Sequence, residues 1–326
     1  MKAVVCSSLK GIEDLALAEI EAPLLKPGTV RIQVKAASVN FPDILMAKGL
    51  YQVQPPLPFV LGVEGAGDII DVADDVSDLA IGQRVMTYAG QGCFAEQAVV
   101  PAQRVYRIPD AMDYATASGF SLAFGTTYHA LVDCGGLADQ QTVLILGASG
   151  GLGLCAVQLA KAMGARVIAA ASTEEKRAVC ADMGSDFTID SDAGRLREQV
   201  RAITNGRGVD IVFDVVGGSL TDPALRCIVP YGRYVIVGYA AGIPNIKANL
   251  VLLKQARVVG VSYRQFVESR PDDARSNMEK ILQIWRSGRL RSAVPSQFLH
   301  ADFKSALKLM EDRRVIGKAI IRIAQN

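Results

Sequence analysis

Apolar and polar residues alternate in short segments along the first part of the chain, as far as about Ser118. Glycine and proline bound these segments, which are KAVVC at 2–6, VRIQVKAAS at 30–38, GAGDIIDVA at 65–73, GQRVMTY at 82–88 and GCFAEQAVV at 92–100. Alternation with a period of two residues places one face of a strand against a core and the other toward water. This part of the chain is therefore predicted to form a mostly β module.

Between residues 119 and 260 the pattern changes to apolar runs that alternate with segments of helical period. The predicted strands are VLIL at 143–146, RVIAA at 166–170, FTI at 187–189, VDIVFDVV at 209–216, RYVIVGY at 233–239 and ARVVGVS at 256–262, and the predicted helices are 151–163, 174–183, 193–204 and 219–228. Strands that are joined by crossover helices pair in parallel, with helices on both faces of the sheet. We expect an α/β fold with a doubly wound parallel sheet of the Rossmann type.

The remaining residues, 261–326, return to mixed character. They contain predicted helices at 273–287 and 302–312 and the extended segments SQFLH at 296–300 and KAIIRI at 318–323. Because the α/β module interrupts the β module, we expect this tail to complete the latter. Residues 1–118 and 261–326 are thus predicted to form one domain and residues 119–260 a dinucleotide-binding domain, with the cofactor in the cleft between them.

Composition limits the class of partner. The chain has 326 residues, half of them hydrophobic, and its 35 basic and 33 acidic side chains give a net charge of +2. This balance provides no strong field for nucleic acid or an anionic membrane, so we expect a small molecule in a pocket. The pattern predicts neither a leader peptide nor a membrane span. The six cysteines show no C-x-x-C pairing, which favours buried free thiols in a reducing, cytoplasmic setting.

The stretch TVLILGASGGLGLCAVQLAKAMGARVIAAA at 142–171 has the order strand, glycine-rich turn, helix and strand. Its turn has the spacing of the G-x-G-x-x-G motif, with alanine in the first place. Such a turn lets a pyrophosphate approach the backbone, and the helix N-terminus offers amide donors and a positive dipole. The alternative is a tight turn that binds nothing. The residues that we expect to bind a dinucleotide here are Ala148, Ser149, Gly150, Gly151, Leu152 and Gly153.

Ser172 follows the second strand of this unit, at the position where a site selective for NAD carries an acidic residue for the ribose 2′-hydroxyl. A hydroxyl there, with Lys176 and Arg177 one helical turn later, suits a 2′-phosphate, which a carboxylate would repel. We therefore expect NADPH as the cofactor, with Ser172 and Lys176 among its contacts. The alternative is that both cations are exposed residues of the next helix and that Glu175 neutralises one of them.

Five segments of the chain carry a resemblance to a known family. They are SVNFPDILMAKGLY at 38–51, LPFVLGVEGAGDI at 57–69, SLAFGTTYHAL at 121–131, LGASGGLGLCAVQLAKAMGARVIA at 146–169 and DIVFDVVGG at 210–218. Together they resemble the medium-chain dehydrogenase/reductases and, within these, the quinone oxidoreductases related to zeta-crystallin. The resemblance covers essentially the whole chain. It implies that the first domain is a GroES-like catalytic domain and the second a Rossmann domain.

The zinc-dependent alcohol dehydrogenases of this family typically carry a Cys-His pair in the segment that matches SVNFPD and a His-Glu pair in a G-H-E-G motif. Here the Cys-His pair is replaced by Asn40 and Phe41, and the second histidine is replaced by Val63, beside a retained Glu64. The loop of four closely spaced cysteines that binds structural zinc is also absent, and the chain has only two histidines. No metal site is therefore expected.

The resemblance also implies catalytic roles. Zinc-free members place polar groups near the nicotinamide from the segment that here supplies Asn40, Asp43 and Tyr51. Tyr51 is then a candidate proton donor or oxyanion stabiliser, Asn40 a donor to substrate or ribose, and Asp43 an orienting group. Alternatively, Tyr51 caps a loop, Asn40 satisfies backbone groups in a turn, and Asp43 caps a helix that begins at Ile44.

Further cofactor contacts follow from the resemblance alone. It implies Thr126 at the nicotinamide carboxamide, Gly238 and Tyr239 in the nicotinamide pocket, and Lys318 near the mouth of the cofactor or substrate site. It also implies a homodimer that pairs through the apolar segment ARVVGVS, which would otherwise leave a sheet edge exposed.

A nicotinamide gives up a hydride, so without a metal the acceptor must already be electron-poor. Quinones and α,β-unsaturated carbonyls meet this condition, and the expected function is the NADPH-dependent reduction of one of them. Two alternatives stay open. One is an enoyl-thioester reductase, such as an acryloyl-CoA reductase, and the other is a non-catalytic NADPH-binding protein of the crystallin type.

Overall fold

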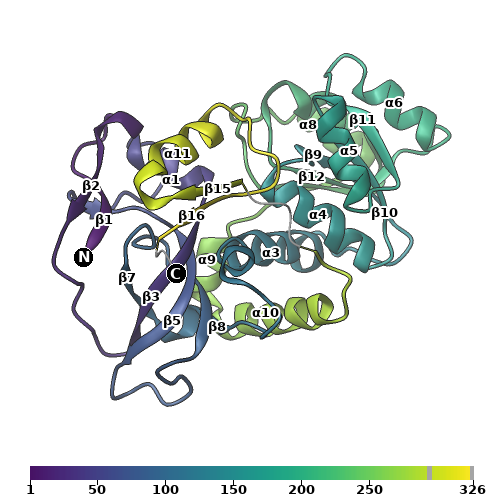
Figure 1. Cartoon of the computed structure of the whole chain (residues 1–326). Coiled ribbons are helices and arrows are strands. Elements are labelled where there is room, and N and C mark those ends of the chain that lie inside the picture. Colours follow the sequence, from purple (N-terminus) through teal and green to yellow (C-terminus); the bar gives the residue numbers. More distant parts are fainter. Residues whose placement is uncertain (292–295, 324–326) are drawn as a thin grey trace. The chain divides into compact units, whose positions relative to one another are not determined.

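The computed structural model describes residues 1–291 and 296–323, and the chain divides into two compact units (Figure 1). The first unit contains Met1–Leu122, Val267–Met278 and Val294–Asn326, and the second contains Ala123–Phe266 and Glu279–Ala293. The domain bounds at 118 and 260 that the sequence suggests stay a prediction.

The first unit is built mostly of antiparallel strands, as the alternating pattern of its sequence predicts. Its larger sheet has the order β15-β16-β3-β5-β6-β8, with β7 paired to β3, and a second sheet has the order β2-β1-β4. The strands of the larger sheet are β3 (Thr29–Val39), β5 (Glu64–Val72), β6 (Arg84–Tyr88), β7 (Gln97–Pro101), β8 (Val105–Arg107), β15 (Ser296–Leu299) and β16 (Ala319–Arg322). Those of the smaller sheet are β1 (Lys2–Cys6), β2 (Leu15–Glu19) and β4 (Phe59–Val60).

Strand β3 positions the polar residues of this unit. Its neighbours β5 and β16 both run antiparallel to it, with Ser38 opposite Glu64 and Val39 opposite Ala319. The carboxyl end of β3 therefore lies between the amino ends of two strands that are far apart in the sequence. The helices of this unit are α1 (Phe41–Ala47), which follows β3 directly, α2 (Tyr114–Ser118), and α11 (Phe303–Glu311), which packs against α1 and β16.

The second unit contains a six-stranded parallel sheet with the order β11-β10-β9-β12-β13-β14. Its strands are β9 (Thr142–Leu146), β10 (Arg166–Ala171), β11 (Phe187–Asp190), β12 (Val209–Asp214), β13 (Ile228–Ile236) and β14 (Arg257–Gly260). The helices that connect them are α4 (Gly151–Ala162), α5 (Glu174–Asp182), α6 (Leu196–Ile203), α7 (Thr221–Cys227) and α8 (Ala248–Lys254). This is the strand order of a Rossmann fold, so the predicted fold class is confirmed.

The central strands are buried throughout because helices cover both faces of the sheet. Every residue of β9 and β12 is buried, and strands buried on both faces form continuous hydrophobic runs.

The remaining helices are less regular in sequence, and only the one near 273–287 was predicted. They are α3 (Ser121–Tyr128), the π-helical turn η3 (His129–Cys134), α9 (Tyr263–Ser269) and α10 (Pro271–Arg286). Within the described residues, no helix has the length and hydropathy needed to span a bilayer.

Candidate functional site

The glycine-rich turn lies at the point where the strand order of the Rossmann sheet reverses. It follows β9, whose two neighbours in the sheet are β10 and β12. Gly147 has a φ of 68°, and a Cβ there would come within 2.8 Å of a methyl group of Val216, in the loop after β12. A Cβ at Gly153 would lie 2.3 Å from the Gly147 carbonyl oxygen. Only glycines allow this close packing of helix α4 on the strand ends.

Helix α4 has an open N-terminus at this turn. Gly150 is its N-cap residue, and no side chain caps the first turn, so its first amides are available to an anion. Helix α3 contacts the same place, because the Thr127 hydroxyl donates to the Leu152 carbonyl oxygen at 3.4 Å. The neighbouring Thr126 Oγ1 is buried and has no hydrogen-bond partner among the described residues. A buried hydroxyl needs a partner, so both features fit a bound dinucleotide.

The carboxyl end of β10 carries the residues that were predicted to select the cofactor. Ser172 is exposed, and Thr173 is the N-cap of α5, with its hydroxyl oxygen accepting from the Lys176 amide at 3.3 Å. The Arg177 side chain turns back over the strand end, where Nη1 donates to the Ala171 carbonyl oxygen at 3.2 Å. The structure thus places a guanidinium next to the residue that precedes Ser172. From the sequence, Arg177 could be recognised only as the second of two cations, because no pattern indicates its contact with the Ala171 carbonyl oxygen.

The loops after β12 and β13 are bound to each other at the same edge of the sheet. The Asp214 carbonyl oxygen accepts from the amides of Val237 and Gly238 at 2.8 and 3.1 Å. The Asp214 carboxylate accepts from the buried Tyr234 hydroxyl at 2.6 Å. Tyr239 is 41% exposed, so its ring is accessible. Gly238 and Tyr239 therefore lie at the carboxyl ends of the strands, where Rossmann folds bind their ligands. Their contact with a nicotinamide stays a prediction.

A second group of predicted residues comes together in the first unit, at the carboxyl end of β3. The Lys318 ammonium donates to Asn40 Oδ1 and to Glu64 Oε1, both at 2.8 Å. The Asn40 side-chain nitrogen donates to Glu64 Oε1 and to the Ser38 carbonyl oxygen, both at 3.0 Å. Lys318 precedes β16, Asn40 follows β3 and Glu64 begins β5, so the strand register creates this arrangement. We call these three side chains the Lys318 network.

Glu64 is the most buried member of the Lys318 network. Its side chain is 0% exposed, against 9% for that of Lys318. The second carboxylate oxygen, Oε2, accepts from the Leu122 amide at 2.9 Å and from the Ser121 hydroxyl at 3.3 Å. Since an isolated charge costs several kcal/mol to bury, Glu64 depends on these partners. The retained glutamate thus joins β5, β16 and the start of α3.

Asp43 fixes the backbone around this network. One carboxylate oxygen accepts from the amides of Gly62 and Val63 at 3.2 and 3.1 Å, and the other accepts from the Asn40 amide at 2.8 Å. Burial raises the pKa of Asp43 to about 7 and the nearby Glu64 adds to this rise, although the three backbone donors oppose it. Asp43 therefore ties the segment before β5 to the start of α1, which is an orienting arrangement.

The structure around α1 bears on two of the predicted residues, Asp43 and Tyr51. The helix begins at Phe41 and not at Ile44, but Asp43 does cap it, because its carboxylate accepts from the amide of the N-cap residue Asn40. Tyr51 lies in the irregular segment after the helix and is half-buried. Its role as a proton donor stays a prediction.

The network limits what Asn40 and Lys318 can offer a ligand. A side-chain amide has two N–H groups, and Asn40 as oriented uses both on Ser38 and Glu64. It can therefore accept through Oδ1 but has no N–H left to donate, in contrast to the donor role that the resemblance implies. The Lys318 ammonium has three N–H groups, of which Asn40 and Glu64 take two. The roles of both residues toward a ligand stay predictions.

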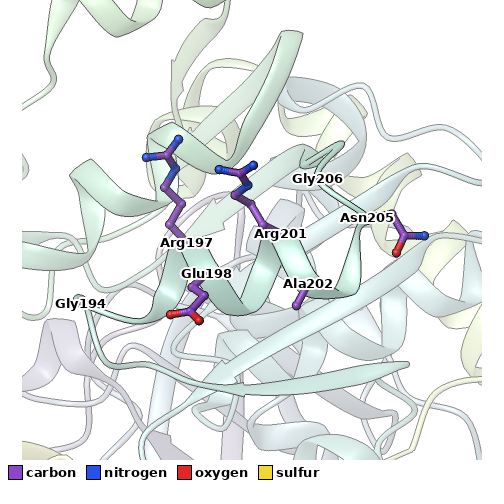
Figure 2. A pocket seen from close by; sticks show the side chains of 7 residues that line it. All are labelled: Gly194, Arg197, Glu198, Arg201, Ala202, Asn205 and Gly206. Carbon is purple, nitrogen blue, oxygen red and sulfur yellow. The ribbon is translucent and has the colours of Figure 1, made fainter.

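Neither a metal cluster among the described residues nor the open hollow along α6 coincides with these predicted site residues. Among the described residues, no three His, Cys, Asp or Glu side chains are grouped to hold a metal ion. Figure 2 shows an open hollow along α6, from which the Arg197 and Arg201 side chains extend on the same side of the helix. Its lining residues are Gly194, Arg197, Glu198, Arg201, Ala202, Asn205 and Gly206. None of the predicted site residues is among them.

Comparisons with known proteins match both units. The family model for the alcohol dehydrogenase GroES-like domain matches residues 26–110, and that for the zinc-binding dehydrogenases matches residues 151–283. A quinone oxidoreductase-like protein 2 homolog of Nematostella vectensis is 33% identical over 331 residues, which cover 99% of this chain and 89% of that protein.

Two solved structures are similar over the same length. A mycobacterial protein complexed with NADPH has a TM-score of 0.92 and 26% identity, with 99% of this chain and 100% of the other covered. A quinone oxidoreductase of Pseudomonas syringae pv. Tomato DC3000 has a TM-score of 0.92 and 27% identity, with 99% of both chains covered.

Proposed function

Because the chain belongs to the quinone oxidoreductase family of the medium-chain dehydrogenase/reductases, we propose that it is a NADPH-dependent reductase of quinones or related α,β-unsaturated carbonyls. The observation that carries this proposal is the glycine-rich turn at the switch point of the Rossmann sheet, followed by the uncapped N-terminus of α4. A similar solved protein is complexed with NADPH, which supports the choice of cofactor.

The cofactor contacts are proposed from the second unit. The backbone amides of Gly151, Leu152 and Gly153 would bind the pyrophosphate, because the Gly150 amide already donates to the Gly147 carbonyl oxygen. The Thr126 hydroxyl, which is buried and has no partner among the described residues, would bind the nicotinamide end. Ser172 leaves space for a 2′-phosphate, with Lys176 and Arg177 as its cations. When bound, NADPH supplies the hydride.

The catalytic contacts are proposed from the first unit. Reduction of a carbonyl or quinone places negative charge on oxygen, and a nearby proton donor stabilises it. Tyr51 is the proposed donor because it carries a hydroxyl and is half-buried rather than enclosed. The proposed roles of Asn40 and Asp43 are to hold this segment, and Lys318 fixes the amide of Asn40.

Chemistry without a metal follows from the residues that replace the zinc ligands. Asn40, Phe41 and Val63 offer neither thiolate nor imidazole. The Lys318 ammonium lies 2.8 Å from both Asn40 Oδ1 and Glu64 Oε1, and a second cation beside it would be repelled. The positive charge at this position therefore comes from the chain itself.

We expect p-benzoquinone and 9,10-phenanthrenequinone to oxidise NADPH faster than acryloyl-CoA or a simple enone does. The reason is that a quinone accepts a hydride without activation by a metal, and the same rates should persist in the presence of EDTA. The measurement is the initial rate of loss of NADPH absorbance with each acceptor in parallel, and elemental analysis of the purified protein should find no stoichiometric zinc.

Each other outcome of this assay points to one of the remaining functions. A clear preference for acryloyl-CoA would indicate an enoyl-thioester reductase. NADPH binding without turnover of any acceptor would indicate a binding protein. Loss of activity with EDTA, restored by zinc, would contradict the metal-free mechanism.

We also propose that two copies pair through β14. Among the described residues this strand pairs only with β13, so its other edge offers free backbone groups to a second copy. Sedimentation velocity should find a dimer across a wide concentration range. A monomer at every concentration would contradict this proposal.

A further inference from the structure

The second unit carries a side-chain cluster that the proposed function does not use. It lies on the π-helical turn η3 and contains a histidine, an aspartate and a cysteine. His129 Nδ1 is 2.8 Å from a carboxylate oxygen of Asp133, and Cys134 Sγ is 3.5 Å from His129 Nε2. The imidazole therefore joins a thiol on one side to a carboxylate on the other.

The π-helical turn brings the thiol to the imidazole. Residues five apart point in directions roughly 140° apart around an α-helix, whereas a π-helix bonds residue i to residue i+5 and places them on one side. The Gly135 amide makes such a bond to the Ala130 carbonyl oxygen at 2.8 Å. A Cβ at Gly135 would lie only 2.8 Å from that oxygen, so glycine suits the end of the turn.

Neighbouring residues of the same unit hold the imidazole and the turn. The Phe266 ring stacks on His129 with centroids 3.9 Å apart and planes 11° apart. Arg233 Nε donates to the Gly135 carbonyl oxygen at 2.7 Å, directly after Cys134. Because a carboxylate only accepts, His129 Nδ1 carries the hydrogen shared with Asp133, and Nε2 faces the sulfur.

The charge state of His129 supports a role in proton transfer. Burial opposes the imidazolium, but the hydrogen bond to Asp133 and the contact with Cys134 outweigh it and raise the pKa of His129 to about 9. The imidazolium is therefore the main form at neutral pH. A cation in contact with a cysteine stabilises the thiolate, which is the nucleophilic form.

Cys134 also differs from the other cysteines in exposure. All six are free and all lie within the described residues, but five are buried and only Cys134 is half-buried. Thiols enclosed in apolar surroundings are inert, whereas a partly exposed thiol beside a cation is reactive. Reagents in solution should therefore reach Cys134 first.

We propose that Cys134, His129 and Asp133 form a nucleophilic site at which the protein captures soft electrophiles by conjugate addition. In the resting pair the thiol proton already lies on His129 Nε2, and the Cys134 thiolate forms a bond to the β-carbon of an α,β-unsaturated carbonyl or to a quinone ring carbon. The electron pair of the C=C bond moves to the carbonyl oxygen, and the resulting enolate takes the proton back from His129.

The net step adds S and H across one double bond, so it needs no oxidant or reductant. Asp133 keeps the hydrogen on Nδ1 and so keeps Nε2 directed at the sulfur. The site goes beyond the proposed function, because neither NADPH nor hydride transfer takes part. The test of this site can therefore fail while the reductase assay succeeds. It can also succeed while the reductase assay fails.

The experiment treats the purified full chain with N-ethylmaleimide in the absence of NADPH and follows intact mass with time. We expect one fast adduct per chain, located on Cys134 by peptide mapping and lost in Cys134→Ser. His129→Phe keeps a ring for the Phe266 stack but removes the base, and should slow the reaction at least about tenfold. Asp133→Asn should slow it less, and the control Asp139→Asn, whose carboxylate lies outside the cluster, should react at the wild-type rate.

Two further measurements separate the cluster from general effects on folding. In concentrated guanidinium chloride all variants should alkylate at one common rate per thiol, because the cluster exists only in the folded chain. Thermal melts should show that His129→Phe and Asp133→Asn are folded under the assay conditions. The proposal is overturned if the first adduct maps to another cysteine, or if both folded variants react as fast as the wild type.

Discussion

Replacement of Ser172 by aspartate should change the cofactor preference from NADPH toward NADH by about a hundredfold in the ratio of kcat/KM values. The aspartate would place a carboxylate where the 2′-phosphate is proposed to lie, and it would accept a hydrogen bond from a free 2′-hydroxyl. Each of these effects is worth roughly 1.5–3 kcal/mol when a charge is involved, and even their lower sum of about 3 kcal/mol corresponds to about two orders of magnitude. The measurement uses one quinone throughout and compares kcat/KM for both cofactors.

The cations near Ser172 provide a complementary test. Lys176→Ala and Arg177→Ala should each weaken NADPH use by about tenfold or more and leave NADH use nearly unchanged, as expected for a lost charge-assisted bond to a phosphate. Arg201→Ala on α6 is a matched control, because it removes an exposed cation from a helix of the same unit that contacts β10 at its amino end, through Arg166, and not at Ser172.

A comparison of Lys176→Ala with Arg177→Ala also tests whether Arg177 recognises the phosphate or holds the end of β10. Arg177 bonds the Ala171 carbonyl oxygen, so its loss could loosen the strand end for both cofactors. If Arg177→Ala lowers both cofactors equally while Lys176→Ala is selective, Arg177 is structural and Lys176 recognises the phosphate. If neither variant is selective and Ser172→Asp leaves the preference unchanged, the proposed 2′-phosphate site is wrong.

The Rossmann sheet could be predicted because its physical signals are local. The strands β9 and β12 are rich in apolar residues and buried along their whole length. The glycine spacing that follows β9 has a steric reason that two residues, Gly147 and Gly153, make explicit. Such signals need no knowledge of distant parts of the chain. The six strands of this sheet and four of its connecting helices were therefore predicted in the right order, whereas α8, between β13 and β14, was not predicted.

The polar contacts could not be predicted, because they depend on tertiary register or on local departures from regular structure. Lys318 and Glu64 are 254 positions apart, and only the antiparallel pairing of β3 with both β5 and β16 brings them together. The contact of Cys134 with His129 depends on a π-helical turn, which the helical period does not reveal. A resemblance to a family located Asn40 and implied a donor role for it, but could not show that Ser38 and Glu64 take both of its N–H groups.

Replacement of Lys318 by methionine should destabilise the first unit by about 3–5 kcal/mol, the usual cost of leaving a buried charge without its partner. Glu64 is fully enclosed, and its Oε1 would keep only the Asn40 amide as a donor after the substitution. The measurement is the free energy of unfolding from urea titration, followed by a signal from the first unit. Lys35→Met is the matched control, because its ion pair with Asp68 in the same unit is about one-third exposed and should contribute less than about 1 kcal/mol.

The double variant Lys318→Met with Glu64→Gln distinguishes a lost charge balance from lost packing. Glu64→Gln alone should also be costly, because in either orientation the amide nitrogen would face an N–H donor, which is Lys318 or Asn40 at one position and the Leu122 amide at the other. Once Lys318 is gone, the Asn40 amide can turn so that Oδ1 accepts from the new glutamine, and no buried charge is left. We therefore expect the double variant to be more stable than either single variant, with a coupling energy above about 1 kcal/mol. Additive losses would mean that Lys318 acts through the packing of its methylene chain against Gly119 and that its ion pair with Glu64 does not hold the network together.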